Sequence, residues 1–137
     1  MIGILIVSHG GFGEALIHGA SHVLGKRPPN MYQLGVTLHD DPDTILAKAQ
    51  ALVRQLDDGD GVIVFTDILG ATPSNIASRL LRPGRVEGVS GVSLPMLIRA
   101  LTYRNEPLAE VVSRAMNTAR ECTVHIGCDT RDAPSRN

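Results

Sequence analysis

Two short segments of the chain carry side chains that could act together as a reactive site. His9 follows the apolar run 3–7 within Ser8-His9-Gly10-Gly11, and Asp67 follows the apolar run 61–66. A neutral imidazole is a strong nitrogen nucleophile near neutral pH, because its ordinary pKa of about 6.5 leaves much of it unprotonated. A carboxylate that accepts a hydrogen bond from Nδ1–H would hold the ring in one tautomer and leave Nε2 to attack phosphorus. We therefore expect His9 to react and Asp67 to orient it.

The turns that follow these two residues are rich in backbone amides that could hold a phosphoryl group. Glycine turns and helix N-termini point N–H groups toward anions, and a helix end contributes typically about 0.3–1 kcal/mol when exposed. No Lys or Arg stands in either turn, so the group would be held loosely, which suits its transfer better than its hydrolysis. The expected phosphate-binding residues are Gly10, Gly11, Gly70, Ala71 and Thr72, and no metal-binding residues are expected.

Apolar runs of strand length alternate with segments of helical periodicity along the chain. Strands are expected at residues 3–7, 31–36, 61–66 and 86–92, with a short final strand at 123–127. Capping residues and prolines mark the helix starts. Helices are expected from Phe12, after an N-cap at Asp41, after an N-cap at Thr72, after Ser93 and from Pro107.

Strands and helices that alternate through short connections predict an α/β fold. We expect a single doubly wound domain of three layers, with a mainly parallel sheet of order 2-1-3-4 and a short, antiparallel extra strand at the C-terminus. In that order the first and third strands are neighbours, and ligands of open α/β sheets bind at the switch point between them. His9 and Asp67 would meet there. The domain is expected to span residues 1–128, followed by a flexible tail at 129–137.

The composition argues against several classes of function. The 137 residues are 43% hydrophobic and 20% charged with a net charge of −1, which indicates a folded domain without nucleic acid as a partner. Only 3% of the residues are aromatic, so few side chains could stack on bases. The N-terminus lacks the basic segment of a signal peptide, and no apolar run approaches the roughly 20 residues of a membrane span, so a cytoplasmic location is expected. Cys122 and Cys128 form neither a zinc motif nor a CxxC pair and are expected to be free thiols, and no cofactor is expected.

The remaining histidines are interpreted as structural or solvent-exposed. His18 and His22 have the i, i+4 spacing of a metal pair, but no acidic residue lies between them, so a solvated helix face is favoured over zinc. His39 lies in a loop; a plain loop residue is favoured over the alternative, a place on a partner surface. His125 is assigned a structural position in the final strand.

Three motifs together resemble one protein family. They are Val7-Ser8-His9-Gly10, Phe65-Thr66-Asp67-Ile68-Leu69-Gly70-Ala71-Thr72-Pro73 with Asn75-Ile76-Ala77 after it, and Ser90-Gly91-Val92-Ser93-Leu94-Pro95-Met96-Leu97. In this order and spacing they are similar to the IIA component of the mannose-family phosphoenolpyruvate-dependent sugar phosphotransferase system, over residues 1–119. The resemblance implies that His9 is phosphorylated, that Asp67 is its partner and that Thr72 contacts phosphate. Two positions depart from the family pattern, since Ser93 stands where asparagine is usual and Thr72 where serine is common.

The resemblance also implies a function and partners. A IIA component is a phosphotransferase with a phosphohistidine intermediate, which accepts its phosphoryl group from the phosphocarrier HPr and passes it to a IIB component. It is linked to the membrane only indirectly, through a sugar permease, and is commonly a homodimer whose last strand contributes to the subunit contact. Many relatives continue through an Ala/Pro-rich linker into a IIB domain, whereas this sequence ends at Asn137. A separate IIB protein, or a regulatory role for phosphorylated His9, is therefore expected.

Three other functions are weighed against this one. Ser8-His9-Gly10 resembles the Arg-His-Gly motif of histidine phosphatases, but serine replaces the arginine that would clamp phosphate. A receiver-like module phosphorylated on Asp67 would need an acidic cluster where His9 stands. The phosphotransfer subunit of a dihydroxyacetone kinase also begins with a Val-Ser-His turn, whereas Thr72-Pro73 and Leu94-Pro95-Met96-Leu97 favour the mannose-type family.

Overall fold

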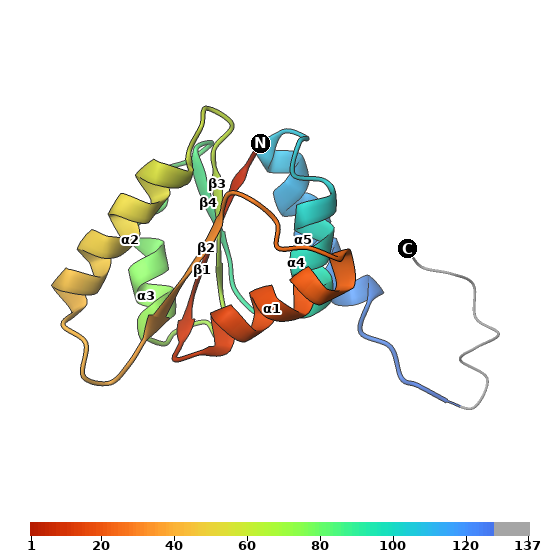
Figure 1. The fold of residues 1–137 in the computed structure, drawn as a ribbon, viewed down its shortest axis with the longest axis horizontal. Helices are drawn as coiled ribbons and strands as arrows, with labels where there is room; N and C mark the ends of the chain where they lie inside the picture. Colours follow the sequence, from red (N-terminus) through yellow and green to blue (C-terminus); the bar gives the residue numbers. More distant parts are fainter. Residues whose placement is uncertain (128–137) are drawn as a thin grey trace.

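Four parallel strands form one sheet, and helices cover both of its faces (Figure 1). The structure is a computed structural model that describes residues 1–127. The strand order is β2-β1-β3-β4, which confirms the predicted order 2-1-3-4. The strands are β1 (Gly3–His9), β2 (Met31–Val36), β3 (Val62–Thr66) and β4 (Val86–Val89).

Five helices in the described chain follow the predicted alternation. They are α1 (Phe12–Leu24), α2 (Pro42–Leu56), α3 (Thr72–Ser78), α4 (Leu94–Thr102) and α5 (Leu108–Glu121). Helices α1, α4 and α5 lie on one face of the sheet, and α2 and α3 lie on the other (Figure 1). The chain therefore has the expected three layers.

The helix starts agree with the predicted caps in two cases and differ in one. Asp41 and Ser93 cap α2 and α4, each accepting a hydrogen bond from the amide three residues further on. The prediction that Thr72 caps α3 is wrong, because Ala71 is the N-cap and Thr72 is the first helical residue. The hydroxyl of Thr72 is therefore not engaged in capping.

Strands β1 and β3 are buried on both faces, which explains their continuous apolar sequences. Alternate side chains of β1 point to opposite sides of the sheet. Ile4 and Ile6 pack with α1, α4 and α5, whereas Leu5 and Val7 pack with α2 and α3. Burial of each such side chain contributes about 1.5–3 kcal/mol. The two strands that end at His9 and Asp67 are therefore held firmly by both helix layers.

Arg104, between α4 and α5, is 5% exposed. Its guanidinium donates to the carbonyl of Ile2 at 2.7 and 3.1 Å, of Pro29 at 2.7 Å and of Asn30 at 2.8 Å. Burial lowers the pKa of Arg104, and the charge of Asp58 partly opposes that shift. No carboxylate in residues 1–127 forms an ion pair with it, so these carbonyls compensate the buried charge. The side chain thereby joins the α4–α5 loop to the start of β1 and to the α1–β2 connection.

The predicted extra strand at residues 123–127 is not confirmed, since in the described chain this segment follows α5 without forming a strand. A strand needs a neighbour to pair its amides and carbonyls, and neither edge strand of the sheet, β2 or β4, pairs with it. Its apolar side chains Val124 and Ile126 are exposed. His125 is exposed as well, so the structural position assigned to it is not confirmed either.

Three further expectations concern the length of β4, membrane-spanning helices and the C-terminal residues. Strand β4 is shorter than predicted, ending at Val89, although the Val92 amide still donates to the Thr66 carbonyl at 3.0 Å. No helix within residues 1–127 combines the length and the apolar character needed to cross a bilayer. Cys128 and the predicted tail at 129–137 lie outside the described residues.

We expect Arg104→Met to lower the free energy of unfolding by about 2–4 kcal/mol, because methionine fills much of the volume but removes every guanidinium hydrogen bond to the carbonyls of Ile2, Pro29 and Asn30. Urea unfolding should show a lower midpoint with an unchanged slope. The control Arg120→Met removes an exposed arginine that donates only to Asn117, and it should change the free energy by less than about 0.5 kcal/mol. Equal stability of Arg104→Met and the parent chain would contradict the role assigned to Arg104.

Candidate functional site

His9 and Asp67 meet at the carboxyl edge of the sheet, where α1 begins next to the tip of β1 (Figure 1). His9 Nδ1 lies 2.7 Å from Asp67 Oδ2, and the His9 amide donates to the same oxygen at 2.9 Å. The His9 side chain is 55% exposed, whereas that of Asp67 is 14% exposed. The predicted meeting of these two side chains is therefore confirmed. Within the described residues Nε2 has no hydrogen-bond partner, and the exposed ring is accessible to another molecule.

The parallel pairing of β1 with β3 produces this contact. Val7 pairs with Thr66 in register, so the residues that follow them end side by side. Neighbouring strands lie about 4.8 Å apart, which brings side chains at adjacent strand ends within hydrogen-bond reach. A strand inserted between β1 and β3 would separate the two side chains by roughly 10 Å and abolish the contact.

Asp67 is held in its ionised form by its hydrogen bonds. Burial by itself raises the pKa of the carboxyl, but hydrogen bonds from the His9 amide, the His9 ring and the Ile68 amide outweigh burial and lower that pKa. The Ile68 amide donates to Oδ1 at 2.8 Å, so both carboxylate oxygens are engaged. An ionised Asp67 accepts a hydrogen bond from Nδ1–H, which favours the Nδ1–H tautomer of His9 and leaves the lone pair on Nε2.

A close approach of two backbones shapes the turn after His9. Gly10 has a left-handed backbone with φ of +51°, and its amide donates to the Val36 carbonyl at 3.0 Å. A Cβ on Gly35 would lie 2.2 Å from the Gly10 carbonyl oxygen, so β2 supports this turn only with glycine at that position. Sequence analysis missed Gly35, although a glycine inside a strand often marks such a close approach.

The predicted phosphate-binding residues occupy two turns at this edge of the sheet, with Gly10 and Gly11 after β1 and with Gly70, Ala71 and Thr72 after β3. The Gly10 amide is already engaged by a carbonyl, so Gly10 shapes the turn rather than offering a donor. The Gly70 amide makes only a long hydrogen bond of 3.3 Å to Ser74 Oγ. Thr72 is exposed at the start of α3. The structure thus brings these residues to one edge and removes one amide from the predicted set.

Ser8 lies beside the site but faces away from it. The side chain is fully buried beneath α1, and a Cβ on Gly13 would lie 3.0 Å from Ser8 Oγ. This hydroxyl has no hydrogen-bond partner in the described residues. It therefore cannot clamp a phosphoryl group on His9.

The other polar candidates are separate from this pair. His18 and His22 are exposed on α1, as the solvated-face interpretation predicted, and His39 is exposed in the loop after β2. Cys122 is a free thiol, as expected. Within residues 1–127 no group of three or more histidine, cysteine or acidic side chains could hold a metal ion.

The fold and the pair together define an open α/β domain with an exposed histidine and its carboxylate partner at the switch point of the sheet. Residues 3–116 match the model of the EIIA-man family, described as the PTS system fructose IIA component, where PTS is the phosphotransferase system. The chain therefore belongs to the mannose-type IIA family of the sugar phosphotransferase system, as its three motifs indicated.

Individual relatives agree with this assignment. The chain is 32% identical to the mannose-specific EIIAB component of Escherichia coli K12 over 123 residues, which cover 88% of this chain but only 38% of that protein. It is 24% identical to the fructose-specific EIIA component of Bacillus subtilis 168 over 132 residues, or 92% of this chain and 90% of that protein. The solved EIIA component from Streptococcus agalactiae superposes with a TM-score of 0.81 at 25% identity, over 91% of this chain and 97% of that one.

We expect the stabilising effect of Asp67 to depend on pH. Its pKa is lower in the folded chain, so its ionisation stabilises the fold above the unfolded pKa of about 3.9, and this stabilisation is lost as the pH falls through the folded pKa. Asp67→Asn should be less stable than the parent chain by about 1–2 kcal/mol at neutral pH, because it loses charge-assisted hydrogen bonds. The difference, measured by urea unfolding, should shrink below about pH 4. A difference that stays constant from neutral pH into the acid range would be inconsistent with this assignment.

Proposed function

We propose that this chain is a phosphocarrier of the sugar phosphotransferase system, in which His9 accepts a phosphoryl group and passes it on. The observation that carries the proposal is the 2.7 Å contact between His9 Nδ1 and Asp67 Oδ2 in a chain of the IIA family. Because that contact engages Nδ1, the reacting atom is Nε2. The exposure of the ring, 55%, allows the donor and the acceptor to approach it in turn.

The proposed transfer is a substitution at phosphorus. The Nε2 lone pair forms an N–P bond while the bond from phosphorus to the donor atom breaks, and the donor atom keeps that electron pair. His9 retains its Nδ1 proton, so the ring gains a positive charge, which the adjacent Asp67 carboxylate offsets. No proton has to leave His9. In the second substitution a nucleophile of the acceptor forms a bond to phosphorus while the N–P bond breaks, and Nε2 takes back its electron pair.

We propose that the neighbouring turns hold the phosphoryl group while it is on His9. Gly11 is the N-cap of α1, whose first amides have no partners within the helix. Gly70 and Ala71 lie in the turn after Asp67, and the Thr72 hydroxyl stands at the start of α3. Neither turn contains Lys or Arg. Hydrogen bonds to cationic groups are about twice as strong as neutral ones, so their absence favours a group that is easily handed on.

We propose HPr as the donor and a IIB component as the acceptor. The family assignment supports both partners. Large apolar side chains are exposed at this edge of the sheet: Phe12, the first residue of α1, is 42% exposed, and Leu38, Ile68 and Leu69, in the loops after β2 and β3, are 99%, 59% and 79% exposed. Such a cluster around an accessible histidine suits docking of protein partners better than capture of a free metabolite. Without a IIB acceptor, the phosphorylation state of His9 would act as a regulatory signal.

The alternative functions have weaker support. A histidine-phosphatase-like hydrolase lacks its phosphate clamp, because the position before His9 is the buried Ser8. A receiver-like role is disfavoured because both carboxylate oxygens of Asp67 are engaged by hydrogen bonds. The match to the EIIA-man family favours the sugar system over a dihydroxyacetone kinase.

We expect incubation with phosphoenolpyruvate, enzyme I and HPr to add one phosphoryl group to His9. Intact-mass spectrometry should show a single addition that is stable in alkali and lost in acid, as an N–P bond requires. His9→Ala should stay unlabelled, whereas His39→Ala, which removes another exposed histidine, should be labelled fully. Asp67→Asn should be labelled at least about tenfold more slowly, because the ring loses its orienting carboxylate. Full labelling of His9→Ala would exclude His9 as the carrier.

We also propose a homodimer that involves the segment 123–127. Val124 and Ile126 are 51% and 78% exposed, and a groove of about 420 Å³ beside α4 presents Leu94 and Ile98. Light scattering should give roughly twice the chain mass of 14.6 kDa. Changing both Val124 and Ile126 to aspartate should yield a monomer, because an interface cannot bury unpaired charges without cost. A monomeric mass for the parent chain at every concentration would contradict the dimer.

A further inference from the structure

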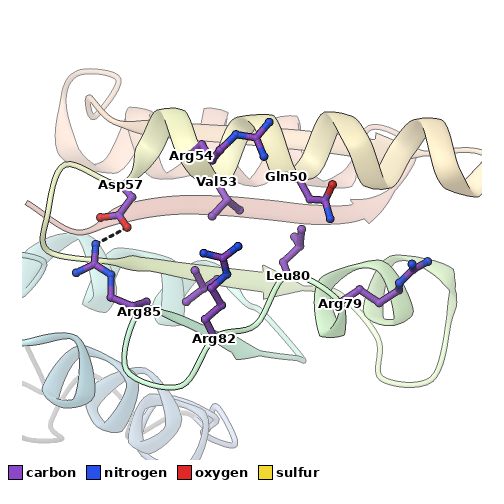
Figure 2. A pocket seen from close by; sticks show the side chains of 9 residues that line it. Gln50, Val53, Arg54, Asp57, Arg79, Leu80, Arg82 and Arg85 are labelled. Carbon is purple, nitrogen blue, oxygen red and sulfur yellow. Dashed lines mark hydrogen bonds and ion pairs between the residues drawn. The ribbon is translucent and has the colours of Figure 1, made fainter.

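A cavity of about 270 Å³ lies between α2 and the connection from α3 to β4 (Figure 2). Its lining includes residues from the C-terminal half of α2 and Val86, the first residue of β4. The cavity therefore opens at the amino edge of the sheet, whereas His9 and Asp67 stand at the carboxyl edge. It is separate from the site proposed for phosphotransfer.

Arginine side chains dominate this cavity. Four guanidinium groups and a single carboxylate line it, which leaves a net charge of +3; they belong to Arg54, Arg79, Arg82, Arg85 and Asp57. Arg85 is paired with Asp57, as the dashed line in Figure 2 marks. Burial raises the pKa of Asp57, but hydrogen bonds from the Gly59 amide, Arg85 and the Gly61 amide outweigh it and lower that pKa. Asp57 is thus ionised and already neutralised by Arg85, and the other three cations have no counter-charge in the cavity.

The three arginines without a counter-charge, Arg54, Arg79 and Arg82, differ from the other arginines of the described chain in their hydrogen bonding. Every other arginine side chain within residues 1–127 has an oxygen acceptor: Arg27, Arg85, Arg99 and Arg114 pair with carboxylates, Arg104 donates to carbonyls and Arg120 donates to an amide oxygen. Arg54, Arg79 and Arg82 have no such acceptor in the described residues, and all three line the same cavity. Like charges gathered without partners repel one another, so an anion placed among them would be bound favourably.

Local backbone structure determines where these cations lie. Arg82-Pro83-Gly84-Arg85 is a tight turn in which the Arg85 amide donates to the Arg82 carbonyl at 2.9 Å, and Gly84 has φ of +78°. Proline followed by a glycine of positive φ is typical of a type II turn, which places its first and last residues close together. Glu87 is the nearby acid, and it accepts from the Gly84 amide at 2.9 Å. The turn therefore presents Arg82 and Arg85 from one wall of the cavity.

The opposite wall adds a neutral donor and apolar surface. Gln50 and Arg54 are four residues apart on α2 and so share one face of the helix, and Figure 2 shows Gln50 extending from α2 toward the wall that carries Leu80. Val53 and Leu80 supply apolar lining between the charged groups. The volume of about 270 Å³ is just below the range of drug-sized ligand sites, about 300 to 1,000 Å³, so the ligand must be small. A small ligand with an anionic end and a short carbon skeleton matches this lining.

We propose that this cavity binds a small phosphorylated metabolite with at least two negative charges. Guanidinium groups match the oxygen geometry of a phosphate in paired hydrogen bonds, so Arg54 and Arg82 would hold the phosphoryl end from opposite walls. The Gln50 amide can donate to a carboxylate or accept from a hydroxyl of the carbon skeleton. This binding does not depend on phosphorylation of His9, so it goes beyond the proposed function.

Isothermal titration calorimetry on the full chain tests the proposal with three probes at low salt: 3-phosphoglycerate, inorganic phosphate and glycerate. We expect 3-phosphoglycerate to bind, glycerate to give no signal, and added sodium chloride to weaken binding. Tighter binding of 3-phosphoglycerate than of inorganic phosphate would identify a phosphorylated carbon compound as the natural ligand class. Equal affinity would identify free phosphate, which shares the same chemistry.

Matched variants locate the binding. Arg54→Gln and Arg82→Gln should each raise the Kd about tenfold or more, because each removes a charge-assisted contact. Lys48→Gln makes the same change of charge on α2 but lies outside the cavity lining, and it should leave the Kd unchanged, as should His9→Ala. These exposed positions let the variants fold, which thermal unfolding can verify. Absence of 3-phosphoglycerate binding, an equal loss in Lys48→Gln, or a loss in His9→Ala with none in the arginine variants would overturn the proposal.

Discussion

The parallel pairing of β1 with β3 is the constraint on which the rest of this structure depends. It brings together two side chains that are 58 residues apart in sequence and places an imidazole nitrogen 2.7 Å from a carboxylate oxygen. Neighbouring helix layers bury both faces of these strands, so the register cannot slip without exposing the core. The Asp67 carboxylate also accepts a hydrogen bond from the His9 amide, which couples the end of the sheet to the orientation of the ring.

The two ends of the sheet carry the two proposed anion sites, which differ in their charge. At the carboxyl edge, an exposed histidine stands among neutral turn amides and apolar side chains, which suits brief occupation and contact with other proteins. At the amino edge, four arginines with one acid line a small cavity, which suits retention of a charged ligand. Helix α3 begins beside the first site and ends next to Arg79 of the second, so one short element spans both.

Much of the fold could be predicted because its local signals agree with its tertiary environment. Helix α2 carries an N-cap, an N-terminal proline and an apolar stripe, and strand β3 is a continuous apolar run, so both were predicted within about one residue. The predictions that failed concern segments whose structure depends on contacts with other parts of the chain. Residues 123–127 alternate as a strand does but have no strand to pair with in the described chain, and α3 begins one residue earlier than the capping preference of Thr72 suggested. Gly35 and Arg104 act only through backbone that is distant in sequence.

The sequence alone determined the alternation of strands and helices, the order of the sheet and the identity of His9 and Asp67 as a pair, because these depend on residue periodicity and on the general rules of parallel sheets. Tertiary structure decided which amides of the turns remain available, since the Gly10 donor is engaged by a carbonyl of β2. It also decided that Arg54, from one helix, joins arginines of a distant turn in a single cavity. Hydrogen-bond partners and gathered charges depend on distances between segments, and those distances exist only after the chain has folded.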